Sequence, residues 1–335
     1  MRKVDAFSHF TFPAFVRALE EASGQPHEFS RLFANTKTLI DADARRALMD
    51  ELGVEQHVLV PLPEIGLSPG VLSRPAVAAR LARGCNEAMS ALVQRHADRF
   101  LGVAMLPQST GDTLAGELEF AVKELGLVGG VLGPGPTLLP PDSPELEALW
   151  AKAETLDVPI WLHPARSAAF PEYEGERASK YQFFQVYSWL LDTTLAMHRI
   201  VFSGVFERHP RLKLVAHHTG ALVPLYCGRL DIGMRFFEAN AGVDYEAKVQ
   251  PPYEPHYAKF FIDTATQAFN PRVLRQAVDF FGPGQVLFGS DAPMDAQGGR
   301  EMGRNADASV AELGLSPAEA EAVYSGNLQR LLSRR

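Results

Sequence analysis

The stretch LKLVAHH, residues 212–218, is an apolar run that ends in two histidines, and three other segments have the same form. They are VDAFSH (residues 4–9), VPIWLH (residues 158–163) and QVLFGSD (residues 285–291), the last of which ends in an aspartate. Short apolar runs of this kind are typical of buried parallel strands. If all four runs are barrel strands, their carboxyl ends meet at one mouth, and the polar residues that end them form one metal site.

Short β-type runs alternate with longer amphipathic segments along the chain, which is typical of repeated βα units and a parallel sheet. Eight such strands close a barrel. We therefore predict an α/β fold, a single-domain (β/α)8 TIM barrel over residues 1–335, because barrels of this length are routinely one domain. The predicted strands cover residues 3–8, 56–60, 100–105, 128–132, 158–162, 212–216, 259–262 and 285–288.

Two connections are longer than a barrel requires, residues 10–40 after the first strand and residues 165–181 after the fifth. Both follow strand carboxyl ends, where barrel enzymes build their sites, so we predict that they form a lid. Plain surface insertion is the alternative. Elsewhere, Gly53 is expected to end a helix, and Ser316 and Glu319 are expected to form a capping box that begins the last one.

The composition of the chain limits the kinds of molecule that it is expected to bind. The net charge is −8 without a cluster of Lys or Arg, which argues against nucleic acid. No export signal and no apolar run of about 18 residues is visible, which argues against a membrane partner. Two cysteines, Cys85 and Cys227, are too few for a disulfide framework and fit a reduced compartment. We expect a cytoplasmic protein whose partner is a small molecule.

Alternation of side chains along a strand predicts which residues share a face. It places Phe7 and His9 together, with Asp5 deeper in the same strand. It also places Trp161 with His163. His217 and His218 are predicted to point in opposite directions, so that only one of them faces the mouth.

Histidine at a single strand end is more often a hydrogen-bonded structural residue than a ligand. Of the eight predicted strands, however, three are followed directly by a histidine and a fourth ends near Asp291. The occurrence of such residues at four strand ends favours one functional site over four separate structural roles.

The chain resembles a known family over almost its whole length. The similarity is carried by DAFSHF, IWLHP, IVFSGVFERHPRLKLVAHHTGALVPLYCGRLD, VLFGSDAP and SGNLQRLL. These segments resemble the amidohydrolase-related (amidohydrolase 2) family, which includes aminocarboxymuconate semialdehyde decarboxylase and γ-resorcylate decarboxylase. The resemblance implies a distorted (β/α)8 barrel with one divalent metal at its mouth, and a homodimer. It implies His9, His163 and Asp291 as metal ligands, and His217 as the catalytic imidazole.

The chain departs from the family pattern at two positions. Many members begin with His-x-His, but Phe7 occupies the first of those positions and has no lone pair to offer. His218 takes the place of a small residue. Three protein ligands would remain, which is a normal catalytic set for zinc, and the same residues could hold manganese or iron. The alternative is that Phe7 abolishes metal binding.

Further residues are predicted around this set. We expect Asp5 and Asp263 behind the ligands, with direct ligation by Asp5 as an alternative, and His218 also outside the ligand set. Substrate contacts are predicted for Phe7, Trp161 and Trp189, whose rings suit a flat molecule, and for Arg166, which could bind a carboxylate; solvated or core positions are the alternative for each.

Two reactions fit these residue types. The metal could bind the oxygens of a carboxylic acid while His217 or Asp291 exchanges protons, which leads to non-oxidative decarboxylation of an aromatic or muconate-type acid. Alternatively, an activated water could hydrolyse a ring amide or lactone, in a reaction that could also proceed without metal. A barrel that only binds a ligand is the non-enzymatic alternative. Resemblance favours the decarboxylase.

Overall fold

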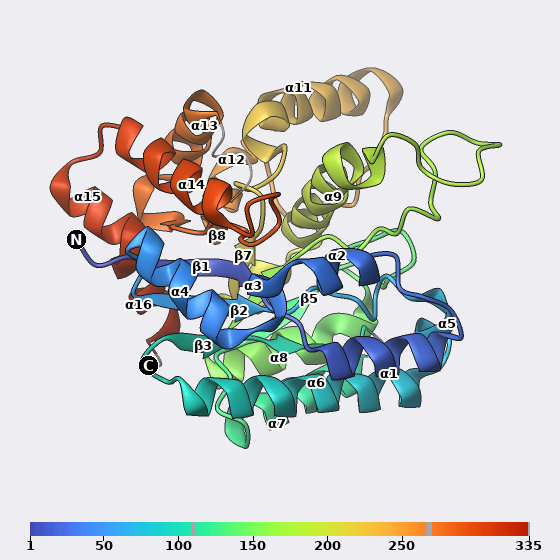
Figure 1. Cartoon of the computed structure of the whole chain (residues 1–335). Coiled ribbons are helices and arrows are strands. Elements are labelled where there is room, and N and C mark those ends of the chain that lie inside the picture. The colour runs from blue at the N-terminus through green and yellow to red at the C-terminus, as the bar shows by residue number, and fades with distance from the viewer. Residues whose placement is uncertain (109–110, 266–269, 334–335) are drawn as a thin grey trace.

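A parallel sheet surrounded by helices forms the centre of the molecule (Figure 1). The computed structural model describes residues 1–108, 111–265 and 270–333. All strand pairs in it are parallel, and every residue of the first strand is buried, as expected for strands covered on both sides. The strands are β1 (Val4–His9), β2 (Gln56–Val60), β3 (Phe100–Gly102), β4 (Ala104–Met105), β5 (Gly130–Leu132), β6 (Pro159–Leu162), β7 (Lys213–Ala216), β8 (Phe260–Asp263) and β9 (Val286–Leu287).

The third predicted strand, residues 100–105, is divided into β3 and β4 at Val103. The hydrogen-bonded order is β1-β2-β3 in one sheet and β4-β5-β6-β7-β8-β9 in the other. At the division, the N–H of Val103 donates to Leu59 O at 3.0 Å, and the N–H of Ala104 donates to Gly129 O at 2.8 Å. The two sheets are therefore joined here through the two halves of one strand.

Backbone hydrogen bonds also join the last strand to the first. The N–H of Ala6 donates to Phe288 O at 2.7 Å, and the N–H of Asp291 donates to Phe7 O at 3.0 Å. With β3 and β4 counted as one strand, eight strands follow one another around a ring. The fold is a (β/α)8 barrel, as the sequence predicted.

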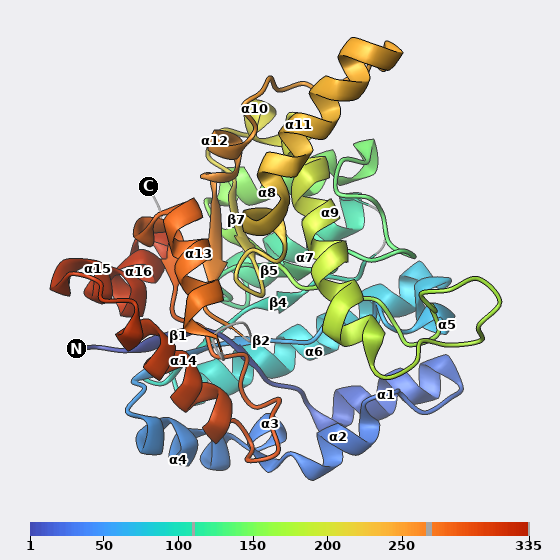
Figure 2. The same cartoon turned by 90° about the horizontal axis from the view of Figure 1, so that it is seen from above.

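Helices surround the ring (Figure 2). Gly53 ends α4 in the left-handed conformation, and Ser316 and Glu319 form the capping box of α15, so both predicted helix ends are confirmed. Among the described residues, no helix is both long enough and apolar enough to cross a membrane. The helices are α1 (Pro13–Ser23), α2 (Ser30–Asn35), α3 (Lys37–Ile40), α4 (Ala42–Leu52), α5 (Pro69–Leu72), α6 (Pro75–Arg95), α7 (Gly111–Lys123), η1 (Pro144–Leu146), α8 (Glu147–Leu156), η2 (Phe184–Ser188), α9 (Trp189–Phe202), α10 (Val205–Arg208), α11 (Val223–Ala241), α12 (Glu254–Tyr257), α13 (Pro271–Phe281), η4 (Pro283–Gln285), α14 (Arg300–Glu312), α15 (Pro317–Glu321), η5 (Ala322–Gly326) and α16 (Asn327–Leu332).

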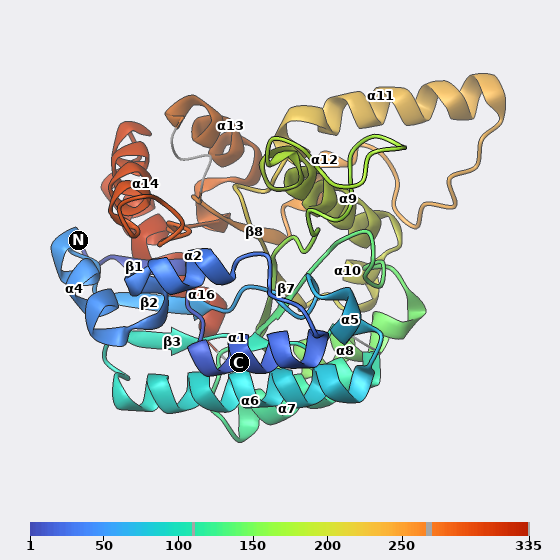
Figure 3. The same ribbon diagram turned by 45° about the vertical axis from the view of Figure 1, so that its right-hand side comes forward.

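The two long connections differ in structure. Residues 10–40 contain α1, α2 and α3, whereas residues 165–181 contain no helix or strand. Farther along the chain, α11 projects away from the body of the barrel (Figure 3). These segments lie outside the ring of strands and leave its geometry intact.

A buried carboxyl group in the connection after β2 makes stability dependent on pH. Glu64 is fully buried, its Oε1 accepts a hydrogen bond from Thr11 Oγ1 at 3.0 Å, and its Oε2 has no hydrogen-bond partner. Burial raises the pKa of Glu64 from 4.5 to about 8. Between these two values the folded chain holds a proton that the unfolded chain has released.

Stability is therefore expected to fall as pH rises through this window, by about 1.4 kcal/mol per pH unit from this one group. Glu64→Gln keeps the shape of the side chain and removes the titration. Urea unfolding at pH 5, 6.5 and 8 should give a flatter pH dependence for the variant than for the unmodified chain. Equal slopes for the two proteins would contradict the assignment.

Candidate metal centre

A cavity of about 290 Å³ opens at the carboxyl ends of the strands. Its polar residues include four that end the segments LKLVAHH, VDAFSH, VPIWLH and QVLFGSD, and its wall is otherwise mainly apolar. The lining residues are His9, Phe29, Leu32, Leu62, His163, Gln185, Val186, Trp189, Leu190, His218, Asp291, Met294 and Met302.

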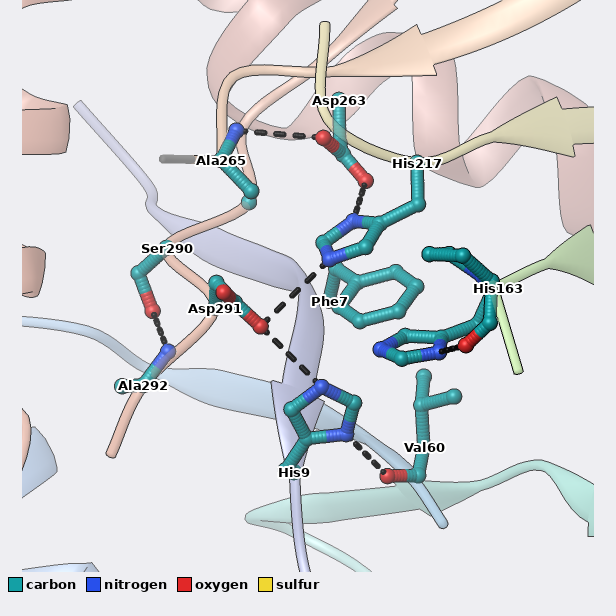
Figure 4. A network of polar contacts seen from close by, with 12 residues as sticks. Phe7, His9, Val60, His163, His217, Asp263, Ala265, Ser290, Asp291 and Ala292 are labelled. Atoms are coloured by element: carbon teal, nitrogen blue, oxygen red, sulfur yellow. Dashed lines mark hydrogen bonds and ion pairs between the residues drawn. The ribbon is translucent and has the colours of Figure 1, made fainter. Parts of the chain in front are cut away.

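Four histidines and one aspartate bring their ligand atoms close together. Figure 4 shows His9, His163, His217 and Asp291 of this group. One set of atoms within 4.8 Å of one another comes from His9, His163 and His217, and a second comes from His217, His218 and Asp291. Asp291 links the two sets, because its Oδ1 lies 3.0 Å from His9 Nε2 and 3.4 Å from His217 Nε2. The strand ends thus converge, and His217 lies at the centre of the group.

Three of the rings are held by hydrogen bonds from Nδ1. His9 donates to Val60 O at 3.0 Å, and His163 donates to Pro164 O at 2.7 Å. A carbonyl oxygen can only accept, so the Nδ1 atoms of these two histidines carry a proton, and in the neutral ring Nε2 is the atom with the lone pair. His217 Nδ1 donates to Asp263 Oδ2 at 2.6 Å. Each contact fixes the ring orientation in the way that is usual for metal-binding histidines.

Several polar atoms of the group are buried without hydrogen bonds. They are His217 Nε2, His218 Nδ1 and Asp291 Oδ1. The aspartate oxygen is close to two imidazoles, yet neither contact has the geometry of a hydrogen bond. Buried polar atoms are rarely left unpaired, and imidazole nitrogens with a carboxylate form a suitable donor set for a divalent metal. The residues therefore fit a metal ion.

Burial and neighbouring charges shift the pKa values of the clustered side chains in different directions. Burial and the neighbouring imidazoles hold the pKa of His163 and that of His218 well below the usual range. Burial alone would raise the pKa of Asp291, but His217 and His9 hold it well below its usual range. Burial alone would lower the pKa of His217, but Asp263 and Asp291 raise it to about 9. Without an ion, the extra proton of the cluster therefore resides on His217.

The prediction that His217 and His218 face opposite ways is wrong. Strand β7 ends at Ala216, and the backbone enters the left-handed region at His218, where φ is 60°. Alternation holds only for extended backbone, so the turn brings both rings to the same site, with centroids 3.7 Å apart. His218 lines the cavity rather than lying outside it.

Asp5 lies beneath the loop that carries Asp291. Its Oδ1 accepts hydrogen bonds from the N–H of Phe7 at 3.0 Å and of Ser290 at 3.1 Å, and its Oδ2 accepts from Ser290 Oγ. Burial raises the pKa of Asp5 to about 7. Asp5 therefore lies behind the ligands and is fully hydrogen-bonded, and it holds the backbone next to Asp291.

Close packing explains the glycine in this loop. A Cβ at Gly289 would lie 3.0 Å from the Cβ of Asp263 and 3.1 Å from that of Phe7. Glycine therefore lets the loop approach both neighbouring strands. Two residues later, Asp291 has a φ of 63°, so the carboxylate is presented from a turn and not from an extended strand.

Of the four predicted substrate contacts, only Trp189 lines the cavity. Phe7 is fully buried, and its ring stacks on His217 with centroids 3.6 Å apart. Trp161 is fully buried in the apolar interior of the barrel. Arg166 donates to both carboxylate oxygens of Asp192, at 2.9 and 2.8 Å. Phe7 and Trp161 therefore pack in the interior, and Arg166 forms an ion pair with Asp192, so none of these three residues makes the substrate contact that was expected of it.

One buried residue behind the site was missed. Arg45, on α4, is fully buried and donates to the carbonyl oxygen of His9 and, at 2.8 Å from Nε, to that of Thr38. The sequence held a signal, because Arg45 shares the spacing of Leu48 and Met49 on the apolar face of its helix. A charge on such a face indicates a buried partner.

The fold and the site together place this chain in the class of (β/α)8 barrels with a candidate metal centre at the carboxyl ends of the strands. The family model described as Amidohydrolase matches residues 41–334. The chain belongs to this family.

Similar proteins of known activity include two curated decarboxylases. The γ-resorcylate decarboxylase of Rhizobium sp. (strain MTP-10005) is 29% identical over 313 residues, which are 88% of each chain. That of Rhodococcus jostii (strain RHA1) is 30% identical over 284 residues, 76% of this chain and 77% of the relative. A solved dihydroxybenzoic acid decarboxylase from Polaromonas sp. JS666, with bound manganese and the inhibitor 2-nitroresorcinol, superimposes with a TM-score of 0.79 at 24% identity, covering 99% of this chain and 96% of the other.

Proposed function

We propose that this chain is a metal-dependent, non-oxidative decarboxylase of an aromatic carboxylic acid. The observation that carries the proposal is the convergence of His9, His163 and Asp291, which line an apolar cavity, with His217 directly behind them. The curated γ-resorcylate decarboxylases support the reaction class.

In this proposal, His9, His163 and Asp291 would hold the metal. When bound, a divalent ion supplies positive charge that binds and orients the substrate's carboxylate and a neighbouring oxygen. His217 donates a proton from Nε2 to the ring carbon that carries the carboxylate, while Asp263 holds Nδ1. The carbon–carbon bond then breaks, its electron pair returns to the ring, and carbon dioxide leaves. Solvent returns the proton to His217.

The cavity wall favours an aromatic monoacid over a muconate-type diacid. No Lys or Arg is present among the described residues that line it, and Gln185 is its polar residue apart from the histidines and Asp291. Most of the other lining side chains are apolar or aromatic, which suits a flat ring and disfavours a second carboxylate.

Removal of the metal is expected to abolish turnover reversibly. Zinc is our first expectation, because two imidazoles and one carboxylate are a common zinc set, while manganese and iron are the alternatives. Protein dialysed against a chelator should lose decarboxylation of 2,6-dihydroxybenzoate and regain it on addition of Zn²⁺, Mn²⁺ or Fe²⁺ one at a time. Full activity of protein with no metal by elemental analysis would contradict the proposal.

We propose one domain over residues 1–335, of which 109–110, 266–269 and 334–335 lie outside the described residues, with residues 10–40 as a lid. Phe29 and Leu32 support this role for the first insertion, because both line the cavity. The wall contains no residue of segment 165–181, but Gln185 and Val186 follow it closely. A cytoplasmic location is also proposed, since Cys85 and Cys227 are both free and buried.

A homodimer is proposed through α9 and α11. Large apolar side chains are exposed along one surface there, namely Leu191, Leu195, Leu225, Tyr226, Ile232, Phe236 and Phe237. Monomers rarely expose so many together. A second copy is the fitting partner, because Leu225, Ile232 and Phe236 share one exposed face of α11. An isologous contact through this face would bury the three side chains of both copies.

A charge in this apolar face tests the pairing. Phe236→Glu is expected to weaken the dimer at least tenfold, whereas the control Glu238→Gln, on the opposite side of α11, is expected to leave it unchanged. Light scattering during gel filtration over a range of concentrations measures the change. A monomer at all concentrations, or equal dimerisation of all three proteins, would contradict the proposal.

A further inference from the structure

Part of the candidate metal centre offers no donor atom. The ring of Phe7 lies among the imidazoles, with its centroid 5.2 Å from that of His9, 3.6 Å from that of His217 and 6.0 Å from that of His163. A phenyl ring cannot bind a cation through a lone pair. The part of the centre formed by β1 therefore contributes only His9.

An additional imidazole enters the same centre from another strand end. His218 is almost fully buried, lines the cavity, and belongs to the set of ligand atoms formed with His217 and Asp291. Its Nδ1 is buried with no hydrogen-bond partner among the described residues. An imidazole nitrogen that is withdrawn from water and left unpaired beside a carboxylate is a suitable metal ligand.

The backbone is arranged to present this ring. His218, Thr219, Gly220 and Ala221 all have φ between 55° and 73°. This left-handed run is unusual for residues other than glycine, and it turns His218 into the mouth where an extended strand would direct it away. The turn is anchored, because Thr219 Oγ1 donates to Ala265 O at 3.2 Å.

We infer that His218 is a metal ligand that compensates for Phe7, so that the ion is held by His9, His163, His218 and Asp291. The inference rests on the proposed function, because it assumes that the centre binds a metal. Three imidazoles and one carboxylate favour zinc over manganese, since imidazole suits zinc and carboxylate-rich sites suit manganese. His217 then remains free to handle protons.

Binding of Co²⁺ to metal-free protein tests the inference without any measurement of turnover. His218→Ala is expected to weaken Co²⁺ binding at least tenfold and to change the visible absorption of the bound ion, and the more conservative His218→Gln should do the same. His256→Ala, at a histidine that lies outside the cavity wall, serves as the matched control. Phe7→His in the His218→Ala background should recover most of the affinity. Circular dichroism of each variant separates loss of the ligand from loss of the fold.

Each outcome decides between the inference and the proposed function. Unchanged affinity and absorption in both His218 variants would overturn the inference while leaving a metal site on the other residues. That result would leave His218 as a contact for the substrate only. If the unmodified chain binds neither Co²⁺ nor Zn²⁺, the proposed metal-dependent function fails together with the inference. X-ray absorption of the zinc form should find three imidazoles in the unmodified chain and two in His218→Ala.

Discussion

Replacement of His217 by asparagine is expected to lower kcat by about 10²–10⁴-fold, the usual contribution of a general acid. His217 Nδ1 is held by Asp263 at 2.6 Å, so its Nε2 is the atom directed at the centre. Asparagine keeps a polar group at the position but cannot deliver a proton to carbon. Steady-state kinetics with a 2-hydroxybenzoic acid would measure the loss.

The metal content separates this role from that of a ligand. We expect His217→Asn to retain its ion, because His9, His163 and Asp291 remain. Loss of both the metal and the activity would make His217 a ligand, whereas full activity would exclude it from proton transfer. Asp263→Asn should reduce kcat less than His217→Asn does, since it disturbs only the orientation of the ring.

Replacement of Asp291 by alanine is expected to remove metal and turnover together. Its Oδ1 lies 3.0 Å from His9 Nε2 and 3.4 Å from His217 Nε2, which makes Asp291 the carboxylate that lies next to a histidine of each set of ligand atoms. Loss of residues that only support a ligand weakens metal binding 10–100-fold, so loss of the carboxylate itself should exceed about 100-fold. Elemental analysis and kinetics on the same preparation measure both effects.

The matched control is Asp279→Ala on the outer surface of α13, where the carboxylate is largely exposed. This variant should retain both metal and activity. An Asp291→Ala protein with a full complement of metal would refute the ligand assignment, even if its activity were lost.

The barrel could be predicted because its strands are short apolar runs that begin and end sharply. Residues 56–60, for example, coincide with β2. The same runs identified His9, His163 and Asp291, since the carboxyl ends of parallel strands must meet at one mouth. Local pattern was sufficient here because a parallel strand that is covered on both faces is apolar at nearly every position.

The remaining parts of the site depend on backbone conformation and long-range partners that sequence patterns do not contain. Alternation failed at His218 because the strand ends one residue before His217 and the backbone becomes left-handed at His218. Arg166 was expected to bind substrate, but its partner Asp192 comes from α9, well along the chain. Leu32 belongs to the insertion at residues 10–40. The spacing of apolar residues along the sequence does not show that this insertion packs against the mouth of the barrel.

Product analysis tests the central claim most directly. Metal-loaded protein would be incubated in D₂O with ¹³C-carboxyl-labelled 2-hydroxybenzoic acids, among them 2,6-dihydroxybenzoate. We predict equal amounts of ¹³CO₂ and of a phenol that carries one deuterium at the carbon that lost the carboxylate. A ring-opened acid that retains the label, or binding of these acids with no release of ¹³CO₂, would contradict decarboxylation at this centre.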